Sequence, residues 1–200
     1  MQTIIFFLCV IMSFSLSAEI RVLALSGSLR QDSFNKKLVK EAALLARQKG
    51  AEVTFVDLKN YLMPFYDADL EAKEGMPQKA KELRQLMIRS NIILIASPEY
   101  NGSLSGTLKN AIDWASRNEK GESSRDAFKG KTFVLMSASP GSGGGTRGLV
   151  HLRAIIENIG GTVLPQQLLV PKAYEAFDTQ GKLINPKLKE DLHQLINSMM

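Results

Sequence analysis

The chain alternates short apolar runs with longer segments of helical period, and this alternation limits its fold more than any other feature. The strand candidates are Ile20–Leu25, Glu52–Asp57, Asn91–Ala96, Thr132–Ser137 and Thr162–Val170. The helix candidates are Asn35–Lys49, Met76–Ser90, Gly106–Ala115, Thr146–Ile159 and Asn185–Met199, with Gly50 and Gly160–Gly161 where helix C-caps belong. This order predicts an α/β fold: an open, doubly wound, five-stranded parallel sheet covered by helices on both faces.

The composition of the chain argues against several classes of function. Two hundred residues with 44% hydrophobic content suit one domain, which we assign to residues 18–200. The net charge is +5, but the basic residues are scattered without interleaved aromatics, which argues against a nucleic-acid partner and favours small anionic ligands. Cys9 is the only cysteine, and His151 and His193 are the only histidines. We therefore predict no disulfide within the chain, no metal site and no histidine-based triad.

Residues 1–17, MQTIIFFLCVIMSFSLS, form an apolar leader with two interpretations. Its apolar core, Ile4–Phe14, is too short for a stable membrane span but suits a signal peptide, and Ser15 and Ser17 suit a cleavage site. No basic residue precedes that core, which favours an uncleaved leader. The first interpretation predicts a periplasmic or secreted protein, and the second a cytoplasmic one.

Ligands of such sheets bind where the strands end, so the loops after the first, third and fourth predicted strands are the candidate site. The first loop, SGSLRQDSFN, precedes a helix and combines hydroxyl groups, an amide and a guanidinium: Ser26, Ser28, Arg30, Ser33 and Asn35. Small side chains and a helix N-terminus suit a phosphate group. There is no Walker lysine, so triphosphate transfer is not indicated. The alternative is an ordinary turn in which Ser33 is the N-cap.

The second loop, SPEYNGSLSG, has Pro98 to end the strand and Asn101–Gly102 for a tight turn. Tyr100 offers a flat face to a ring, or it only covers the end of the sheet.

The third loop, residues 137–148, reads SASPGSGGGTRG. Its glycines favour a close approach of backbone to ligand, although a flexible connection gives the same composition. Together the three loops predict a site for a flat heterocycle with a phosphate tail.

SGSLRQDSFN, SPEYNGSLSGTLKNAIDWASR and the glycine-rich loop resemble the NADPH-dependent FMN reductase family, from about Ile20 onward. The resemblance implies a flavodoxin-like sheet of order 2-1-3-4-5, bound FMN, NADPH or NADH as co-substrate, and a cytoplasmic homodimer or homotetramer. It places the FMN phosphate on Ser26, Ser28, Arg30, Ser33 and Asn35. It places the isoalloxazine ring near Pro98, Glu99, Tyr100, Asn101, Gly102 and Ser103, with Ser137 and Gly141 approaching from the third loop. Ser105 departs from the family, which usually has proline there.

The resemblance also implies the reaction. Hydride passes from NAD(P)H to the flavin and then to a quinone, free flavin or similar small acceptor, and the flavin carries the chemistry. No side chain is predicted to be a catalytic acid or base; Tyr100 and Asn101 position the ring. Two alternatives are a non-enzymatic electron carrier, usually a strongly acidic protein, and a serine hydrolase, whose G-x-S-x-G motif is missing. Arg117, Arg147 and Arg153 are candidates to meet the 2′-phosphate of NADPH.

Overall fold

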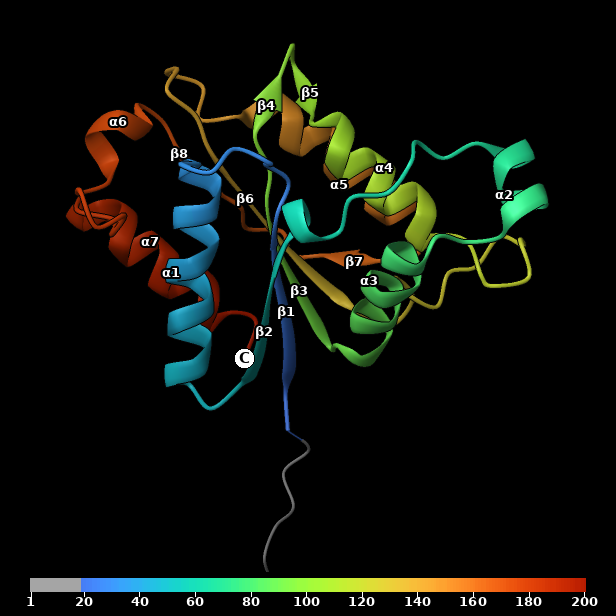
Figure 1. Cartoon of the computed structure of the whole chain (residues 1–200). Helices are drawn as coiled ribbons and strands as arrows, with labels where there is room; N and C mark the ends of the chain where they lie inside the picture. The colour runs from blue at the N-terminus through green and yellow to red at the C-terminus, as the bar shows by residue number, and fades with distance from the viewer. Residues whose placement is uncertain (1–18) are drawn as a thin grey trace, which may run out of the picture.

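The computed structural model describes residues 19–200, so the leader predicted at residues 1–17 lies outside the described part. The sheet contains β1 (Arg21–Ser26), β2 (Glu52–Asp57), β3 (Ile92–Ala96), β6 (Thr132–Ala138), β7 (Thr162–Val163) and β8 (Leu168–Val170). All pairs are parallel, in the order β2-β1-β3-β6-β7, with β8 also pairing with β6 (Figure 1). The predicted fold class and strand order are confirmed.

Helices cover both faces of the sheet (Figure 1). One face packs against α1 (Phe34–Gln48) and α7 (Pro186–Asn197), and the other against α3 (Gln78–Arg89), α4 (Gly106–Ala115) and α5 (Thr146–Asn158). Successive residues of a strand point to opposite faces, so each strand contributes to both cores. Val22 and Ala24 face α1 and α7, for example, while Leu23 and Leu25 face the other layer. The central strands β1, β3 and β6 therefore each contain an unbroken apolar run of four or five residues.

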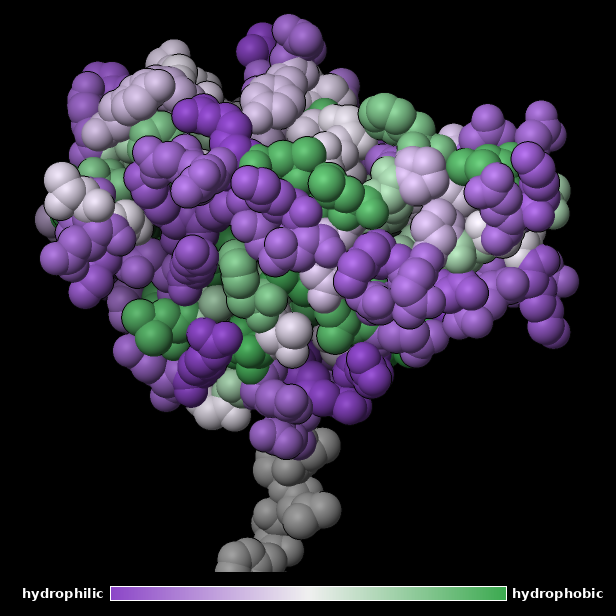
Figure 2. Space-filling view, in the orientation of Figure 1, coloured by the Kyte–Doolittle hydropathy of each residue, from purple (hydrophilic) through white to green (hydrophobic). Residues whose placement is uncertain are grey.

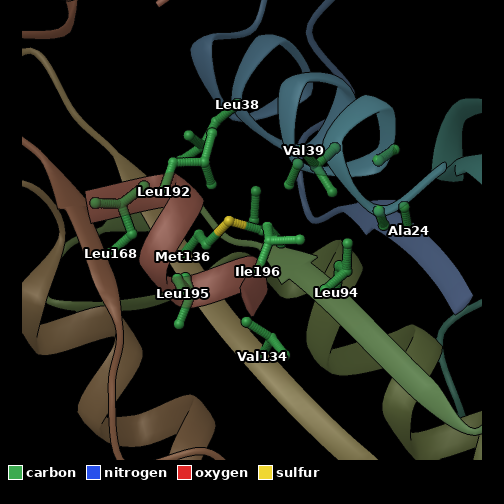
Figure 3. Packing of buried hydrophobic residues seen from close by; sticks show 14 of the residues in the cluster. Ala24, Leu38, Val39, Leu94, Val134, Met136, Leu168, Leu192, Leu195 and Ile196 are labelled. Carbon is green, nitrogen blue, oxygen red and sulfur yellow. The ribbon is translucent and has the colours of Figure 1, made fainter. Parts of the chain in front are cut away.

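Figure 3 shows the first of these cores at close range. Leu38 and Val39 of α1 and Ile196 of α7 lie over Met136 of β6 and Leu94 of β3. All five side chains are fully or almost fully buried. Among residues 19–200, no helix combines the length and the apolar character needed to cross a bilayer.

The last strand differs from the prediction. Thr162–Val170 was expected as one strand, but it is divided into β7 and β8. Val163 pairs with Phe133 and Leu168 with Met136, so four residues on the edge strand face two on β6. The extra residues form a bulge that contains Pro165, which has no N–H to donate. Arg153 of α5 donates to the carbonyl groups of Leu164 and Pro165 and so satisfies the bulged backbone.

Several short elements were not predicted: η1 (Leu58–Asn60), α2 (Ala68–Glu74), α6 (Ala173–Ala176), and the hairpin of β4 (Glu99–Tyr100) and β5 (Ser103–Leu104). Each is too short to show a hydrophobic period. Tertiary contacts fix α2, because its buried Glu71 carboxylate lies 2.8 Å from the Arg117 guanidinium and accepts a hydrogen bond from Tyr66. The predicted glycine caps are confirmed: Gly50 and Gly160 follow α1 and α5 with φ of 91° and 94°.

Candidate functional site

The loops after β1, β3 and β6 lie at one edge of the sheet, at the top of the view in Figure 1, and line one cleft. Larger hollows occur elsewhere on the described residues, so chemistry rather than size singles out this one. Its lining comes from all three loops: Ser28, Arg30, Ser33, Phe34 and Asn35; Pro98, Glu99 and Tyr100; Ala138, Ser139 and Pro140. The three loops that the sequence analysis singled out therefore form one site.

The first loop is shaped by its own hydroxyl groups. Ser26 Oγ accepts a hydrogen bond from the Ser28 N–H, and Ser28 Oγ accepts one from the Arg30 N–H, both at 3.3 Å. Ser33 is the N-cap of α1 and accepts from the Lys36 N–H, as predicted. Within residues 19–200 the Arg30 guanidinium makes no ion pair or hydrogen bond, so its donors are free for an anion.

Asn35 connects the first loop to the third. Its Nδ2 donates to the Ala138 carbonyl and its Oδ1 accepts from the Ala138 N–H, each at 2.9 Å, and the residue is buried. Both polar ends of the amide are thus engaged with the end of β6. Asn35 lines the cleft, and these contacts make it a residue that sets the spacing of the two loops. The sequence gives no sign of this pair, because the partners are 103 residues apart.

The second loop folds into the β4–β5 hairpin. Asn101 and Gly102 have φ of 51° and 80°, so the predicted tight turn is confirmed. Tyr100 is about half exposed (48%) and stands at the cleft. Ser103 Oγ lies 3.0 Å from Nδ1 of His151 on α5. The hairpin therefore presents Tyr100 to the cleft while Ser103 ties it to a helix.

Glu99 attaches the same hairpin to the start of α5. Its Oε1 accepts from Arg147 Nε at 2.9 Å, and its Oε2 accepts from the Gly148 N–H at 3.1 Å. Burial alone would raise the pKa of Glu99, but the Gly148 amide and the Arg147 guanidinium outweigh it and hold the pKa below its ordinary value. Glu99 is therefore a carboxylate at neutral pH, and it is no proton donor. Sequence reasoning placed Glu99 at the ring and missed this anchoring contact.

Two glycines of the third loop have packing roles. A Cβ on Gly145 would lie 1.9 Å from Ser137 Oγ, and Gly145 has φ of 92°. A Cβ on Gly148 would lie 3.2 Å from the Ser103 carbonyl oxygen. Ser137 is fully buried, and its Oγ has no hydrogen-bond partner among the described residues. The cleft is lined by Ala138, Ser139 and Pro140, three residues that sequence reasoning missed, whereas Ser137 and Gly141 are not in its lining.

Ser105, the departure from the family pattern, connects the first and second loops. It is the N-cap of α4 and accepts from the Leu108 N–H, while its hydroxyl donates to the Gly27 carbonyl. A proline could make neither side-chain contact. In the part of the chain that the structure describes, no three His, Cys, Asp or Glu side chains are grouped to hold a metal ion.

The comparisons with known proteins agree with this geometry. The family model described as NADPH-dependent FMN reductase matches residues 20–175. The chain belongs to this family. An NAD(P)H-dependent FMN reductase from Pseudomonas aeruginosa is 34% identical over 92% of this chain and 95% of its own length. An NADPH:quinone oxidoreductase from Arabidopsis thaliana is 35% identical over 90% of both chains.

Structural similarity leads to the same family. A flavoenzyme NAD(P)H:(acceptor) oxidoreductase from Paracoccus denitrificans has a TM-score of 0.73 and 29% identity, covering 90% of this chain and 94% of its own. Membership of an FMN reductase family makes the chain an NAD(P)H-dependent flavin enzyme rather than an electron carrier. FMN is its cofactor, and the residues present fit that group: buried serine hydroxyls and a guanidinium without a partner among residues 19–200 for the phosphate, and Pro98 and Tyr100 for a flat ring.

Proposed function

We propose that the cleft holds FMN with its phosphate in the first loop and its ring beside the hairpin. The supporting observation is that one cleft is lined by all three loops, and that Arg30 on the first loop has no ion-pair partner within the described residues 19–200. Ser28 and Ser33 would donate hydroxyl hydrogens to phosphate oxygens, and Arg30 would add charge-assisted hydrogen bonds. Tyr100 and Pro98 would border the ring. Gly102 and Asn101 shape the turn that carries Tyr100.

The reaction we propose is a ping-pong transfer from NAD(P)H to a quinone or similar small acceptor. Bound FMN supplies the hydride-accepting and hydride-donating chemistry. The protein binds and orients the reactants. Glu99, the carboxyl group in the cleft lining, is not set up as an acid, because both of its oxygens accept hydrogen bonds. A quinone is the acceptor class because related proteins of similar length, from Arabidopsis thaliana among others, are named for it.

The test is a visible spectrum of the purified, FMN-loaded protein in the absence of oxygen. Adding NADPH or NADH is expected to bleach the flavin absorbance, and adding a quinone afterwards to restore it. Each half-reaction is then observed separately, as a ping-pong scheme requires. The proposed function is wrong if the flavin is bound but neither nicotinamide bleaches it.

We further propose that the chain forms a homodimer or homotetramer through an apolar groove beside the cleft. The groove lies between the segment that follows η1 and the start of α4, and Leu29 of the first loop borders it. Leu62 and Phe65 are 63% and 78% exposed there. Figure 2 shows apolar side chains gathered on this face over η1 and the segment after it. Exposed apolar clusters of this kind typically mark contacts between proteins.

Phe65→Glu is expected to shift the assembly to monomers, because a carboxylate at the contact loses its hydration without a partner. Light scattering of the FMN-loaded protein measures the change. Leu44→Glu, an exposed leucine on α1 outside the groove, is the control and should leave the mass unchanged. Equal masses for the wild type and Phe65→Glu would contradict the proposal.

For location, we propose the cytoplasm, as the family resemblance implies. The periplasm or the exterior is the alternative if residues 1–17 are removed as a signal peptide. N-terminal sequencing of the mature protein distinguishes the two, because cleavage after Ser17 leaves Ala18 as the first residue.

A further inference from the structure

Most cationic side chains near the cleft already have an acidic partner. In the first turns of α1 and α4, Lys36, Lys37 and Lys109 pair with Asp57, Asp32 and Asp113. On the three loops, only Arg30 and Arg147 carry a positive charge. Arg30 lines the cleft itself and is assigned to the FMN phosphate. Arg147 pairs with Glu99 as well, but its side chain is 78% exposed and its Nη1 group has no hydrogen-bond partner among residues 19–200, so it can still bind a second anionic ligand.

The other two arginines that the sequence offered for a 2′-phosphate have structural partners. Arg117 pairs with the buried carboxylate of Glu71 and donates to the Gly121 carbonyl. Arg153 pairs with Glu157 and holds the carbonyl groups of the bulge between β7 and β8. Their side chains are only 23% and 27% exposed, whereas that of Arg147 is 78% exposed. All three arginines have an acidic partner, and Arg147 is the one of the three whose side chain is mostly exposed to solvent.

Arg147 is accessible and yet fixed in position. Its Nε and Nη2 lie 2.9 Å and 2.7 Å from Oε1 of Glu99, whose side chain is 11% exposed. Its Nη1 group makes no hydrogen bond with any residue from 19 to 200. A Cβ on Gly102 would lie 3.9 Å from Arg147 Nε, which places the guanidinium beside the hairpin turn. Glu99 thus holds one edge of the planar Arg147 guanidinium, and the other edge can donate hydrogen bonds to the oxygens of a phosphate monoester.

A second donor stands beside it. His151 follows Arg147 by one helical turn on α5, so both side chains project from the same side of the helix. Its Nδ1 is engaged with Ser103, which leaves Nε2 for a ligand. Both residues are exposed, and both are tied to the hairpin that borders the flavin site. Glu99 is the acidic group that faces Arg147. The Glu99 carboxylate also accepts a hydrogen bond from the Gly148 N–H, which stabilises part of its negative charge.

We propose that Arg147, with His151 beside it, binds the 2′-phosphate of NADPH and makes the chain prefer NADPH over NADH. This inference rests on the proposed function, because it assumes that a nicotinamide nucleotide approaches the flavin past the hairpin. NADH has a hydroxyl group at that position, which gives Arg147 no charge to bind. The phosphate would engage Nη1 while Glu99 keeps the other edge of the guanidinium in place.

The experiment compares kcat/KM for NADPH and for NADH in the wild type, Arg147→Gln and Arg89→Gln. Arg147→Gln is expected to lower the NADPH/NADH ratio about 10- to 100-fold, because a hydrogen bond between charged groups is lost. The loss should appear in KM for NADPH rather than in kcat. Arg89→Gln removes the same charge from the end of α3, away from the cleft, and should leave the ratio unchanged.

A binding measurement gives a readout independent of turnover. The FMN-loaded wild type should bind 2′,5′-ADP more tightly than 5′-AMP in a calorimetric titration, and Arg147→Gln should abolish the difference. His151→Gln should reduce it in part. The inference is overturned if the wild type does not discriminate, or if Arg147→Gln weakens both nucleotides equally, since Arg147 would then only support the hairpin. Failure of both coenzymes to bleach the flavin would instead reject the proposed function.

Discussion

Replacing Ser28 and Arg30 together by alanine is expected to weaken FMN binding about 100- to 10,000-fold. Each hydrogen bond to a charged group contributes about 1.5 to 3 kcal/mol, and the double replacement removes at least two such donors. Both side chains line the cleft, and the Arg30 guanidinium has no partner among residues 19–200 that would compete with a phosphate. Titrating the apoprotein into FMN and following the quenching of flavin fluorescence measures the dissociation constant.

Two controls separate a ligand effect from a folding effect. Arg89→Ala removes an arginine from the exposed end of α3 and should leave the FMN dissociation constant unchanged. Urea unfolding of the apoprotein tests whether the loop still folds, because Ser28 Oγ also accepts from the Arg30 N–H. If the double variant folds normally and binds FMN like the wild type, the phosphate does not lie in the first loop.

Gly145→Ala is expected to lower the free energy of unfolding of the apoprotein by about 3 kcal/mol. Alanine at a φ of 92° costs about 1 to 2 kcal/mol, and overpacking against a buried neighbour costs about 1 to 3 kcal/mol. The new Cβ would lie 1.9 Å from Ser137 Oγ and 2.7 Å from Ser137 Cβ, both on the fully buried end of β6. Urea unfolding of the apoprotein followed by circular dichroism measures the change.

A double variant separates the two causes. Adding Ser137→Gly to Gly145→Ala removes both clashing atoms, so the part of the loss due to overpacking should be recovered and the cost of positive φ should remain. Gly143→Ala is the control within the same loop. Its φ is not positive and no atom lies within 4 Å of the place that its new methyl group would take, so the expected change is within about 0.5 kcal/mol. Equal stability of Gly145→Ala and the wild type would contradict the packing described for α5.

The sheet could be predicted because its signal is local. The central strands β1, β3 and β6 contain the unbroken apolar runs VLAL, IILIA and FVLM, and each is followed by a helical period. The edge strand could not be predicted in the same way. TVLPQQLLV is apolar at both ends, but its bulge depends on Arg153 of α5, which satisfies the carbonyl groups that leave the ladder. The hairpin turn was predictable from Asn101–Gly102, since that pair tolerates positive φ.

The site was predictable as a set of loops rather than as a set of contacts. Loop composition placed Ser28 and Arg30 at the cleft, where the structure has them. It could not show that Asn35 is bonded to Ala138, or that Glu99 faces the start of α5, because both partners are distant in sequence. The predicted strand ended at Ser137, whereas β6 continues to Ala138, so Ser137 is buried within the strand and the third loop lines the cleft with Ala138, Ser139 and Pro140.

The bulged edge strand formed by β7 and β8 affects how copies of the chain can associate. A flat, regular outer strand can recruit the outer strand of another molecule through main-chain pairing, and so extend one sheet across two subunits. Here Pro165 has no N–H group to donate, and the additional residues between Val163 and Leu168 break the regular spacing of carbonyl groups along the edge. Assembly by strand addition is therefore disfavoured along this edge of the sheet, and the subunit contact proposed above uses the groove after η1 instead.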